Sequence, residues 1–155
     1  MSAMLVSSIS AAFQPPKNPP IEDTSSFYRK LLSKFPEHLG ESFHTLTGVF
    51  ESRPGEIVTR GVYPITSAFG IGKFFFHASI FDLMNHSIVE YEPVRRGDLM
   101  FLPFEFKDVR PLHPLEPGSE YYIRLSDLSL IDDSIKFKAE FFDGSGCLVL
   151  SVGQV

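Results

Sequence analysis

The chain has 155 residues, of which 43% are hydrophobic and 14% aromatic, and its formal net charge at pH 7 is -5. This composition excludes a mainly disordered chain and provides enough apolar side chains for one domain with a buried core. Nucleic acid is not an expected partner, because the basic residues are scattered rather than gathered with aromatic residues. No apolar run approaches the ~20 residues that span a bilayer, so no membrane span is expected.

The numbers of phenylalanine and cysteine residues indicate what kind of interior and which compartment to expect. The chain has 16 Phe and no Trp, which favours either a densely packed core or a channel for an apolar ligand. Cys147 is the only cysteine and cannot form an internal disulfide, which fits a reducing compartment. We therefore expect a cytoplasmic protein. The N-terminal residues are interpreted as a flexible leader rather than a signal peptide, because no basic segment precedes their apolar residues.

The first expected elements are an arm and a helix. Residues 1–24 contain two pairs of adjacent prolines, which favour extended, poorly packed chain, so this segment is predicted to be a flexible, Pro-rich arm. Residues 25–32 predict a short helix with a serine cap, which ends before Pro36. The rest of the chain, residues 25–155, is predicted to form a single domain.

Six strands are predicted from alternating or β-branched segments that are separated by turn residues. The first two flank Arg53-Pro54-Gly55, a turn signal, and are predicted to form a hairpin. The other four follow a long helical segment. The six predicted strands are residues 45–52, 56–63, 99–109, 120–130, 134–142 and 147–152.

The long apolar stretch from residue 74 to residue 89 lacks strand alternation and predicts a helix. Apolar side chains populate nearly all of its faces, which is typical of a buried helix. One such helix requires a sheet large enough to cover it, and six strands can curl around it. We therefore predict the α+β class: a single hot-dog-like domain in which a curled antiparallel sheet of about six strands wraps round one long buried helix.

Several patterns that carry chemistry in other proteins are incomplete in this chain. Residues 69–72 lack the lysine of a phosphate loop and the third glycine of a dinucleotide site, and Gly144-Ser145-Gly146 is predicted to be a hairpin turn. Cys147 has no histidine beside it and is predicted to be a packed small hydrophobe. His77 and His86 are nine residues apart, on opposite faces of the helix, so a shared metal is not expected. The sequence predicts neither a metal nor a cofactor.

The predicted central helix carries an acid and an imidazole on one face. Asp82 and His86 are four residues apart, which places them one turn from each other. Burial raises the pKa of a carboxylic acid, and a carboxyl group kept protonated can act as a general acid on a leaving hydroxyl. The alternative is a polar pair on a solvated stripe. The apolar character of the helix favours the first interpretation, because a buried Asp costs free energy unless it is satisfied.

Six short segments resemble known motifs in a fixed order. They are Phe27–Leu31 for F-Y-x-x-L, Gly40–Leu46 for G-P-x-F-x-x-L, His77–Asp82 for H-P-x-x-x-D, Asp82–His86 for D-x-x-x-(Q/H), Leu102–Phe104 with Val109 for the L-P-F strand, and Phe142–Gly146 for the D-x-x-G hairpin. In this order they resemble the C-terminal half of the double-hot-dog dehydratase domain of modular polyketide synthases and animal-type fatty acid synthases. The resemblance covers roughly residues 25–155.

The resemblance implies a function. In that family the residue matching Asp82 protonates the β-hydroxyl of a 3-hydroxyacyl thioester, and the residue matching His86 helps to orient it. A histidine of the N-terminal hot dog removes the α-proton, water leaves, and the 2-enoyl chain stays on an acyl carrier protein. The implied catalytic residues are therefore Asp82 and His86. The residues implied to bind substrate are Phe43, His44, His77, Phe81, Leu102, Pro103 and Phe104.

The chain departs from the family pattern at four points. Glu41 and Ala78 stand where the motifs have proline, and the segment between Tyr28 and Phe43 is about one residue longer. The N-terminal hot dog with its catalytic histidine is absent. His44 or His77 could substitute as the base. A single hot dog also exposes a sheet edge, so we expect a homodimer or pairing with a second hot-dog partner.

Three functional hypotheses stay open at this point. The first is dehydration, isomerisation or cyclisation of a carrier-bound polyketide or fatty acyl chain. The second is a non-catalytic or split half that binds an acyl chain or needs a partner subunit. The third is that the chain is a piece of a larger synthase.

Overall fold

The computed structural model describes residues 12–34, 45–63, 80–97 and 105–155. Within these ranges the chain forms a sheet, three α-helices and one 3-10 helix. In chain order the elements are β1 (Glu22–Asp23), α1 (Thr24–Lys34), β2 (Leu46–Phe50), β3 (Ile57–Val62), α2 (Ile80–Ser87), η4 (Ile88–Glu90), α3 (Glu92–Arg96), β4 (Lys107–Pro111), β5 (Glu120–Ile131), β6 (Ser134–Phe142) and β7 (Leu148–Gln154).

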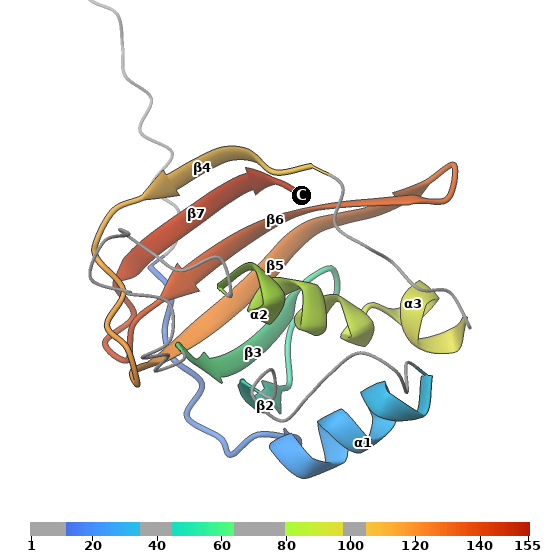
Figure 1. Ribbon diagram of the computed structural model, residues 1–155, viewed down its shortest axis with the longest axis horizontal. Coiled ribbons are helices and arrows are strands. Elements are labelled where there is room, and N and C mark those ends of the chain that lie inside the picture. Colours follow the sequence, from blue (N-terminus) through green and yellow to red (C-terminus); the bar gives the residue numbers. More distant parts are fainter. Residues whose placement is uncertain (1–11, 35–44, 64–79, 98–104) are drawn as a thin grey trace, which may run out of the picture.

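The strands in the described part of the chain form one sheet of seven, in the order β1-β2-β3-β5-β6-β7-β4. Every neighbouring pair is antiparallel, and the sheet curls around α2 (Figure 1). The two edge strands are unlike the interior ones. β1 has only two residues, and β4 carries Pro111 and the charged residues Lys107, Asp108 and Arg110.

The predicted antiparallel sheet is confirmed, with seven strands instead of about six. The extra strand is β1, which pairs Glu22 with Val49 of β2. The predicted hairpins are also present. Gly55 has φ 82°, and Asp132 and Asp133 have φ 48° and 61°, so both turns use left-handed backbone, as tight hairpin turns require.

The central helix is shorter in its described part than the predicted segment 74–89. Residues 74–79 lie outside the described ranges, so the predicted start of the helix is not tested. From Ile80 the chain is α-helical to Ser87 and then continues as the 3-10 turn η4. The sequence prediction missed the short helix α3, which has Pro93 in its first turn, where the missing N–H has no intrahelical partner to lose.

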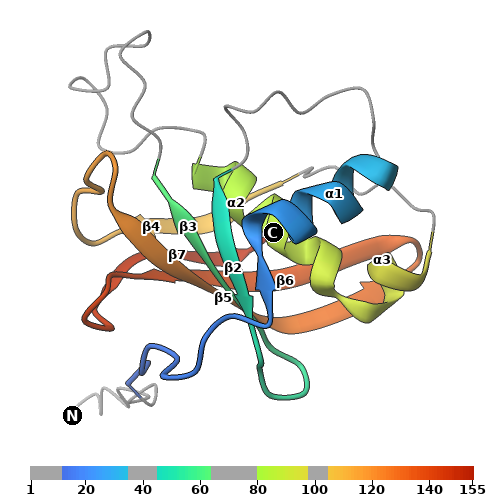
Figure 2. The ribbon, with the colours of Figure 1, turned by 90° about the horizontal axis from the view of Figure 1, so that it is seen from below.

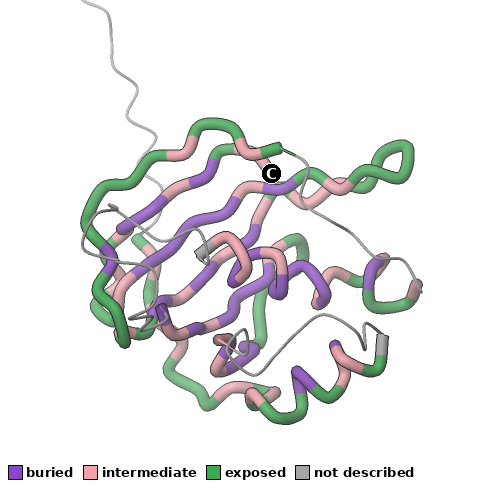
Figure 3. The backbone as a smooth tube through the Cα atoms, in the orientation of Figure 1, coloured by how far each residue is buried: buried purple, intermediate pink, exposed green. Residues whose placement is uncertain are grey.

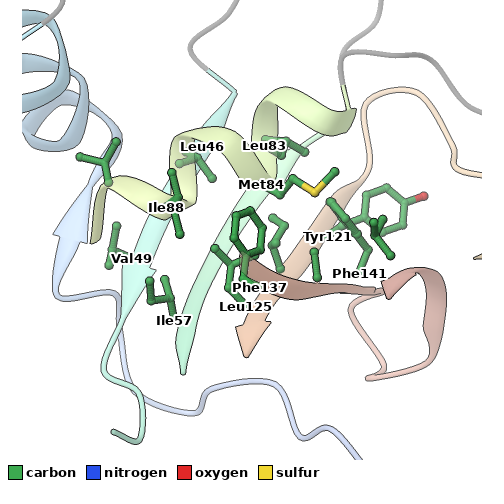
Figure 4. Packing of buried hydrophobic residues seen from close by; sticks show 14 of the residues in the cluster. Leu46, Val49, Ile57, Leu83, Met84, Ile88, Tyr121, Leu125, Phe137 and Phe141 are labelled. Carbon is green, nitrogen blue, oxygen red and sulfur yellow. The ribbon is translucent and has the colours of Figure 1, made fainter. Parts of the chain in front are cut away.

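The hydrophobic core lies between α2 and the concave face of the sheet. Leu83 and Met84 of α2 are fully buried and face Ile123, Leu125 and Phe141 of the central strands. Figure 4 shows Met84, Leu125 and Phe141 among the side chains packed between the helix and the sheet. In the first half of β5, buried and less buried residues alternate (Figure 3), as expected when one face of a sheet packs on a core. The last four residues of β6 are all buried.

A glycine permits α2 to lie close to the sheet. A Cβ atom at Gly61 of β3 would meet Leu83 Cδ2 at 2.4 Å and the Thr45 carbonyl oxygen at 3.1 Å. A hydrogen bond reinforces the contact, because Ser87 Oγ of α2 lies 2.7 Å from Thr59 Oγ1 of β3. The helix that carries Asp82 and His86 is therefore fixed to β3 by shape and by a buried polar link.

The end of the predicted arm packs against part of the opposite face of the sheet (Figure 2). The Phe13 ring stacks on Phe142 with 4.1 Å between centroids, and the Arg124 guanidinium lies over both rings, at 5.7 and 5.1 Å. The division into an arm and a domain stays a prediction. In its described part, however, the arm is packed against the sheet rather than poorly packed, because aromatic stacking offsets the entropy of ordering it.

On this outer face Glu140 of β6 is buried between two cations. It accepts a hydrogen bond from Arg124 Nε at 2.9 Å, and Lys138 lies at 3.1 Å. Burial alone would raise the pKa of Glu140, but the hydrogen bonds and charges of Arg124 and Lys138 outweigh it and hold the pKa below its ordinary value. A carboxylate with a lowered folded-state pKa stabilises the fold above its unfolded pKa, and this stabilisation is lost as the pH falls.

We therefore expect Glu140→Gln to lower the free energy of unfolding at neutral pH. The deficit relative to wild type should narrow as the pH falls below 4.5, the ordinary pKa of Glu. Urea unfolding at a series of pH values measures both quantities. Glu116→Gln, the same change at an exposed position, is the control and should leave the free energy of unfolding at neutral pH close to the wild-type value. A deficit for Glu140→Gln that does not change with pH would contradict the ion-pair account.

Candidate active site

Asp82 and His86 occupy successive turns of α2, as the sequence predicts. Asp82 is half-buried and His86 is buried, with 8% of its surface exposed. The helix is therefore not apolar and buried on every side, because Phe81, Asp82 and Asn85 are only half-buried. The side chain of Asp82 is therefore partly exposed to solvent, whereas the imidazole of His86 lies inside the fold.

The imidazole of His86 is held by a residue from a distant part of the chain. Tyr28 Oη of α1 lies 3.0 Å from His86 Nδ1, and the contact is buried. The two rings meet edge to face, with centroids 5.7 Å apart. The same phenol oxygen accepts a hydrogen bond of 3.0 Å from the backbone N–H of Leu46, at the start of β2. Tyr28 thus ties α1, α2 and β2 together at the candidate site.

The phenol of Tyr28 is held in its protonated form. Burial raises the pKa of Tyr28, and the negative charge of Asp82 acts in the same direction. Interactions with Leu46 and Thr45 oppose this rise without cancelling it. Thr45 Oγ1 is buried with no hydrogen bond of normal geometry in the described residues, so the Leu46 N–H is the donor with clear geometry. Asp82 itself lies one helical turn before His86 on α2.

An aromatic wall lies beside the acid. The Phe81 ring, which precedes Asp82 on α2, stacks on Phe106 with 4.5 Å between centroids and 27° between planes. Both residues are partly buried and pack against the core. Phe81 was predicted to contact substrate, and its position next to Asp82 is compatible with that role. Phe106 extends the wall but was not among the predicted site residues.

The other predicted substrate-binding residues are not placed. They lie outside the described ranges, so their roles stay predictions. The idea that another histidine of this chain serves as the base also stays a prediction. These residues are Phe43, His44, His77, Leu102, Pro103 and Phe104.

The role of Tyr28 was not predicted, although the segment that contains it was recognised. The only local signal was the F-Y-x-x-L motif, because a contact between residues 58 positions apart leaves no trace in helical periodicity. Tyr is also a usual core residue when its hydroxyl finds a partner. The role of Tyr28 therefore depended on knowing how α1 packs against α2.

Cys147 differs from its prediction. It is exposed and free because it belongs to the turn before β7, where its N–H donates to the Asp143 carboxylate at 2.9 Å. Hydrogen bonding, with Ser145 as the largest contributor, lowers the pKa of Asp143. The turn itself, including Gly146 at φ 89°, is the hairpin that the sequence predicts. No group of three His, Cys, Asp or Glu in the described residues could hold a metal ion.

Two hollows in the described part of the chain lie outside the candidate site. One of about 740 Å³ lies between the arm and the β2–β3 hairpin, and one of about 670 Å³ lies beside the turn that contains Cys147. Neither is lined by Asp82 or His86. Among the described helices, none is long and apolar enough to cross a membrane.

Comparison with known proteins gives a clear result for the fold alone. No family model matches the chain, and no curated protein matches it. The dehydratase domain from the CurJ module of the curacin polyketide synthase matches with a TM-score of 0.67 and 21% identity, over 86% of this chain and 47% of that one. The CurF dehydratase domain of the same synthase matches with a TM-score of 0.67 and 14% identity, over 89% of this chain and 47% of that one.

A third match comes from a different source. A variant of the PpsC dehydratase domain from Mycobacterium tuberculosis has a TM-score of 0.69 and 17% identity, over 93% of this chain and 53% of that one. The chain therefore spans about half the length of these domains. Its fold is that of one half of a polyketide synthase dehydratase domain, a single hot dog, and the resemblance seen in the sequence is confirmed at this level.

Proposed function

We propose that the chain is a dehydratase-like protein of polyketide or fatty acid biosynthesis, with Asp82 as the general acid. Its substrate would be a 3-hydroxyacyl chain held as a thioester on an acyl carrier protein. The observation that carries the proposal is the placement of Asp82 on α2, beside the buried pair of Tyr28 and His86, in a fold whose solved neighbours are dehydratase domains. The exposed, unpaired thiol of Cys147 fits a reducing cytoplasm.

The proposed reaction removes water from the acyl chain. A base takes the proton from the carbon next to the thioester carbonyl, and the electron pair of that C–H bond forms the new double bond. The bond from the β-carbon to its hydroxyl oxygen breaks, and the Asp82 carboxyl gives its proton to the leaving oxygen, which departs as water. The resulting Asp82 carboxylate then regains a proton. The same acid could serve ring closure or double-bond isomerisation on this scaffold.

The base is proposed to come from a second hot dog. The chain spans about half the length of the dehydratase domains that it matches, so a partner in the position of the other half would complete the site. A homodimer is the alternative source, with a histidine of the second copy as base. The same half-length favours a second candidate function, in which the chain binds an acyl group without turning it over.

Turnover of a 3-hydroxyacyl-pantetheine thioester distinguishes the two candidates. The product is a conjugated 2-enoyl thioester, so its ultraviolet absorbance reports the rate. We expect the full chain to catalyse dehydration, alone if it forms a homodimer with its own base, or after addition of the N-terminal half of a solved dehydratase domain. If the purified protein retains an acyl chain but forms no enoyl product under either condition, the dehydratase proposal is wrong and acyl binding is the function.

A further inference from the structure

Two polar contacts of Tyr28 Oη have a defined geometry in the described part of the chain. A phenol has one proton to donate and lone pairs that accept, and a backbone N–H only donates. The Leu46 N–H points at Oη at 3.0 Å and uses an acceptor position. His86 Nδ1 also lies 3.0 Å from this oxygen and can accept a hydrogen bond from the phenol O–H. Tyr28 is only 2% exposed, so its O–H needs a protein acceptor.

An ionised phenol could only accept hydrogen bonds, so the protonation state of Tyr28 decides whether it can donate to His86. Because burial raises its pKa, the phenol keeps its proton at neutral pH and can donate it. A neutral imidazole carries its proton on one nitrogen and accepts on the other. If Nδ1 accepts from Tyr28, the proton of His86 must be on Nε2.

We propose that Tyr28 is a positioning residue that selects the tautomer of His86: the Tyr28 O–H donates to Nδ1, and the imidazole proton is held on Nε2. Leu46 orients the phenol by occupying one of its acceptor positions. The two rings meet edge to face, with 83° between their planes.

This inference deepens the proposed function and, where it concerns the reaction, rests on it. With the proton on Nε2, neutral His86 can donate a hydrogen bond to a carboxylate or hydroxyl oxygen but has no free lone pair on Nε2 to remove a proton. His86 therefore orients an oxygen rather than serving as the base. The proton acceptor of the reaction must be a different residue, whether the partner or this chain supplies it.

The tautomer can be read directly from nitrogen chemical shifts. The full chain, labelled with ¹⁵N-histidine, is studied at about pH 8, where an ordinary imidazole is neutral. Long-range proton–nitrogen correlations distinguish a protonated from an unprotonated ring nitrogen, and the loss of one set of signals in His86→Gln assigns His86. We expect an unprotonated Nδ1 and a protonated Nε2. In Tyr28→Phe both shifts should move toward tautomer-averaged values.

Tyr121→Phe is the matched control. Tyr121 is also buried, at 4% exposure, and its hydroxyl also accepts a backbone N–H, from Glu116 at 2.8 Å. The control removes the same kind of bond away from His86, so the His86 shifts should stay at their wild-type values.

Two results would overturn the proposal: a protonated Nδ1 in the wild-type protein, or His86 shifts that are unchanged by Tyr28→Phe. The wild-type spectrum distinguishes the two tautomers even if the variant fails to fold. Because the measurement uses the resting protein without substrate, its outcome is independent of turnover. A protein without dehydratase activity can still show the predicted tautomer, and an active one can fail to show it.

Discussion

Asp82→Asn is expected to lower kcat for dehydration of a 3-hydroxyacyl thioester by about 10²–10⁴-fold, the range that general acid catalysis contributes. The amide has the shape of the carboxyl group but cannot deliver a proton to the leaving hydroxyl. The contact between Tyr28 and His86 does not involve the replaced group, so the variant should keep its fold. A fall in kcat with little change in KM would mark an interaction that forms in the transition state.

Asp132→Asn makes the same chemical change in the exposed β5–β6 turn, where Asn accepts the left-handed backbone at φ 48°. This control should retain wild-type kcat. Both variants are assayed by the appearance of enoyl thioester, with the partner half present if the wild type requires it. If Asp82→Asn turns over at the wild-type rate, Asp82 is not the acid, whatever the fold resembles.

Leu83→Ala is expected to lower the free energy of unfolding by about 2–5 kcal/mol, the range for truncating a buried leucine. The side chain is fully buried and fills the space left by the missing Cβ of Gly61. The surrounding strands are fixed by their ladders and cannot collapse fully into the cavity. Urea unfolding followed by circular dichroism measures the loss. A loss under about 1 kcal/mol would contradict the packing described for α2.

A double-mutant cycle tests whether Gly61 and Leu83 share one space. In the wild-type background Gly61→Ala introduces a Cβ within 2.4 Å of Leu83 and should destabilise by about 1–3 kcal/mol. With Leu83→Ala already present, the added methyl enters a vacant volume. In that background Gly61→Ala should lower the free energy of unfolding less, or raise it. The difference between its effects in the two backgrounds measures the coupling. Additive losses would mean that Leu83 moves aside without cost.

The sheet was predictable because its signals are local. Alternation over a few residues marks a strand, and Asp132-Asp133 or Pro54-Gly55 marks a turn, so the positions of β2, β3, β5, β6 and β7 follow from short windows of sequence. The strand predicted for residues 99–109 is described only from residue 105, and β4 begins at Lys107 and continues to Pro111.

The candidate site was only half predictable. The pair of Asp82 and His86 follows from helical spacing, whereas the phenol that holds His86 comes from α1 and depends on tertiary packing. The packing of the arm was not predicted for the same reason. Phe13 contacts Phe142, which is more than a hundred residues away in the chain, and no local sequence pattern indicates that contact. Cys147 was assigned to a strand, but the turn that Asp143 organises extends one residue further.

The two edges of the sheet limit how this protein can associate. An open edge is a template for adding further strands, and natural sheets restrict it with short strands, charges and proline. At one edge β1 offers only two residues. At the other, β4 combines Pro111 and charged side chains with a left-handed residue, Asp108 at φ 52°, which interrupts a regular ladder. Neither edge offers a long, regular ladder to which further strands could add, so growth of an open fibre through this sheet is disfavoured.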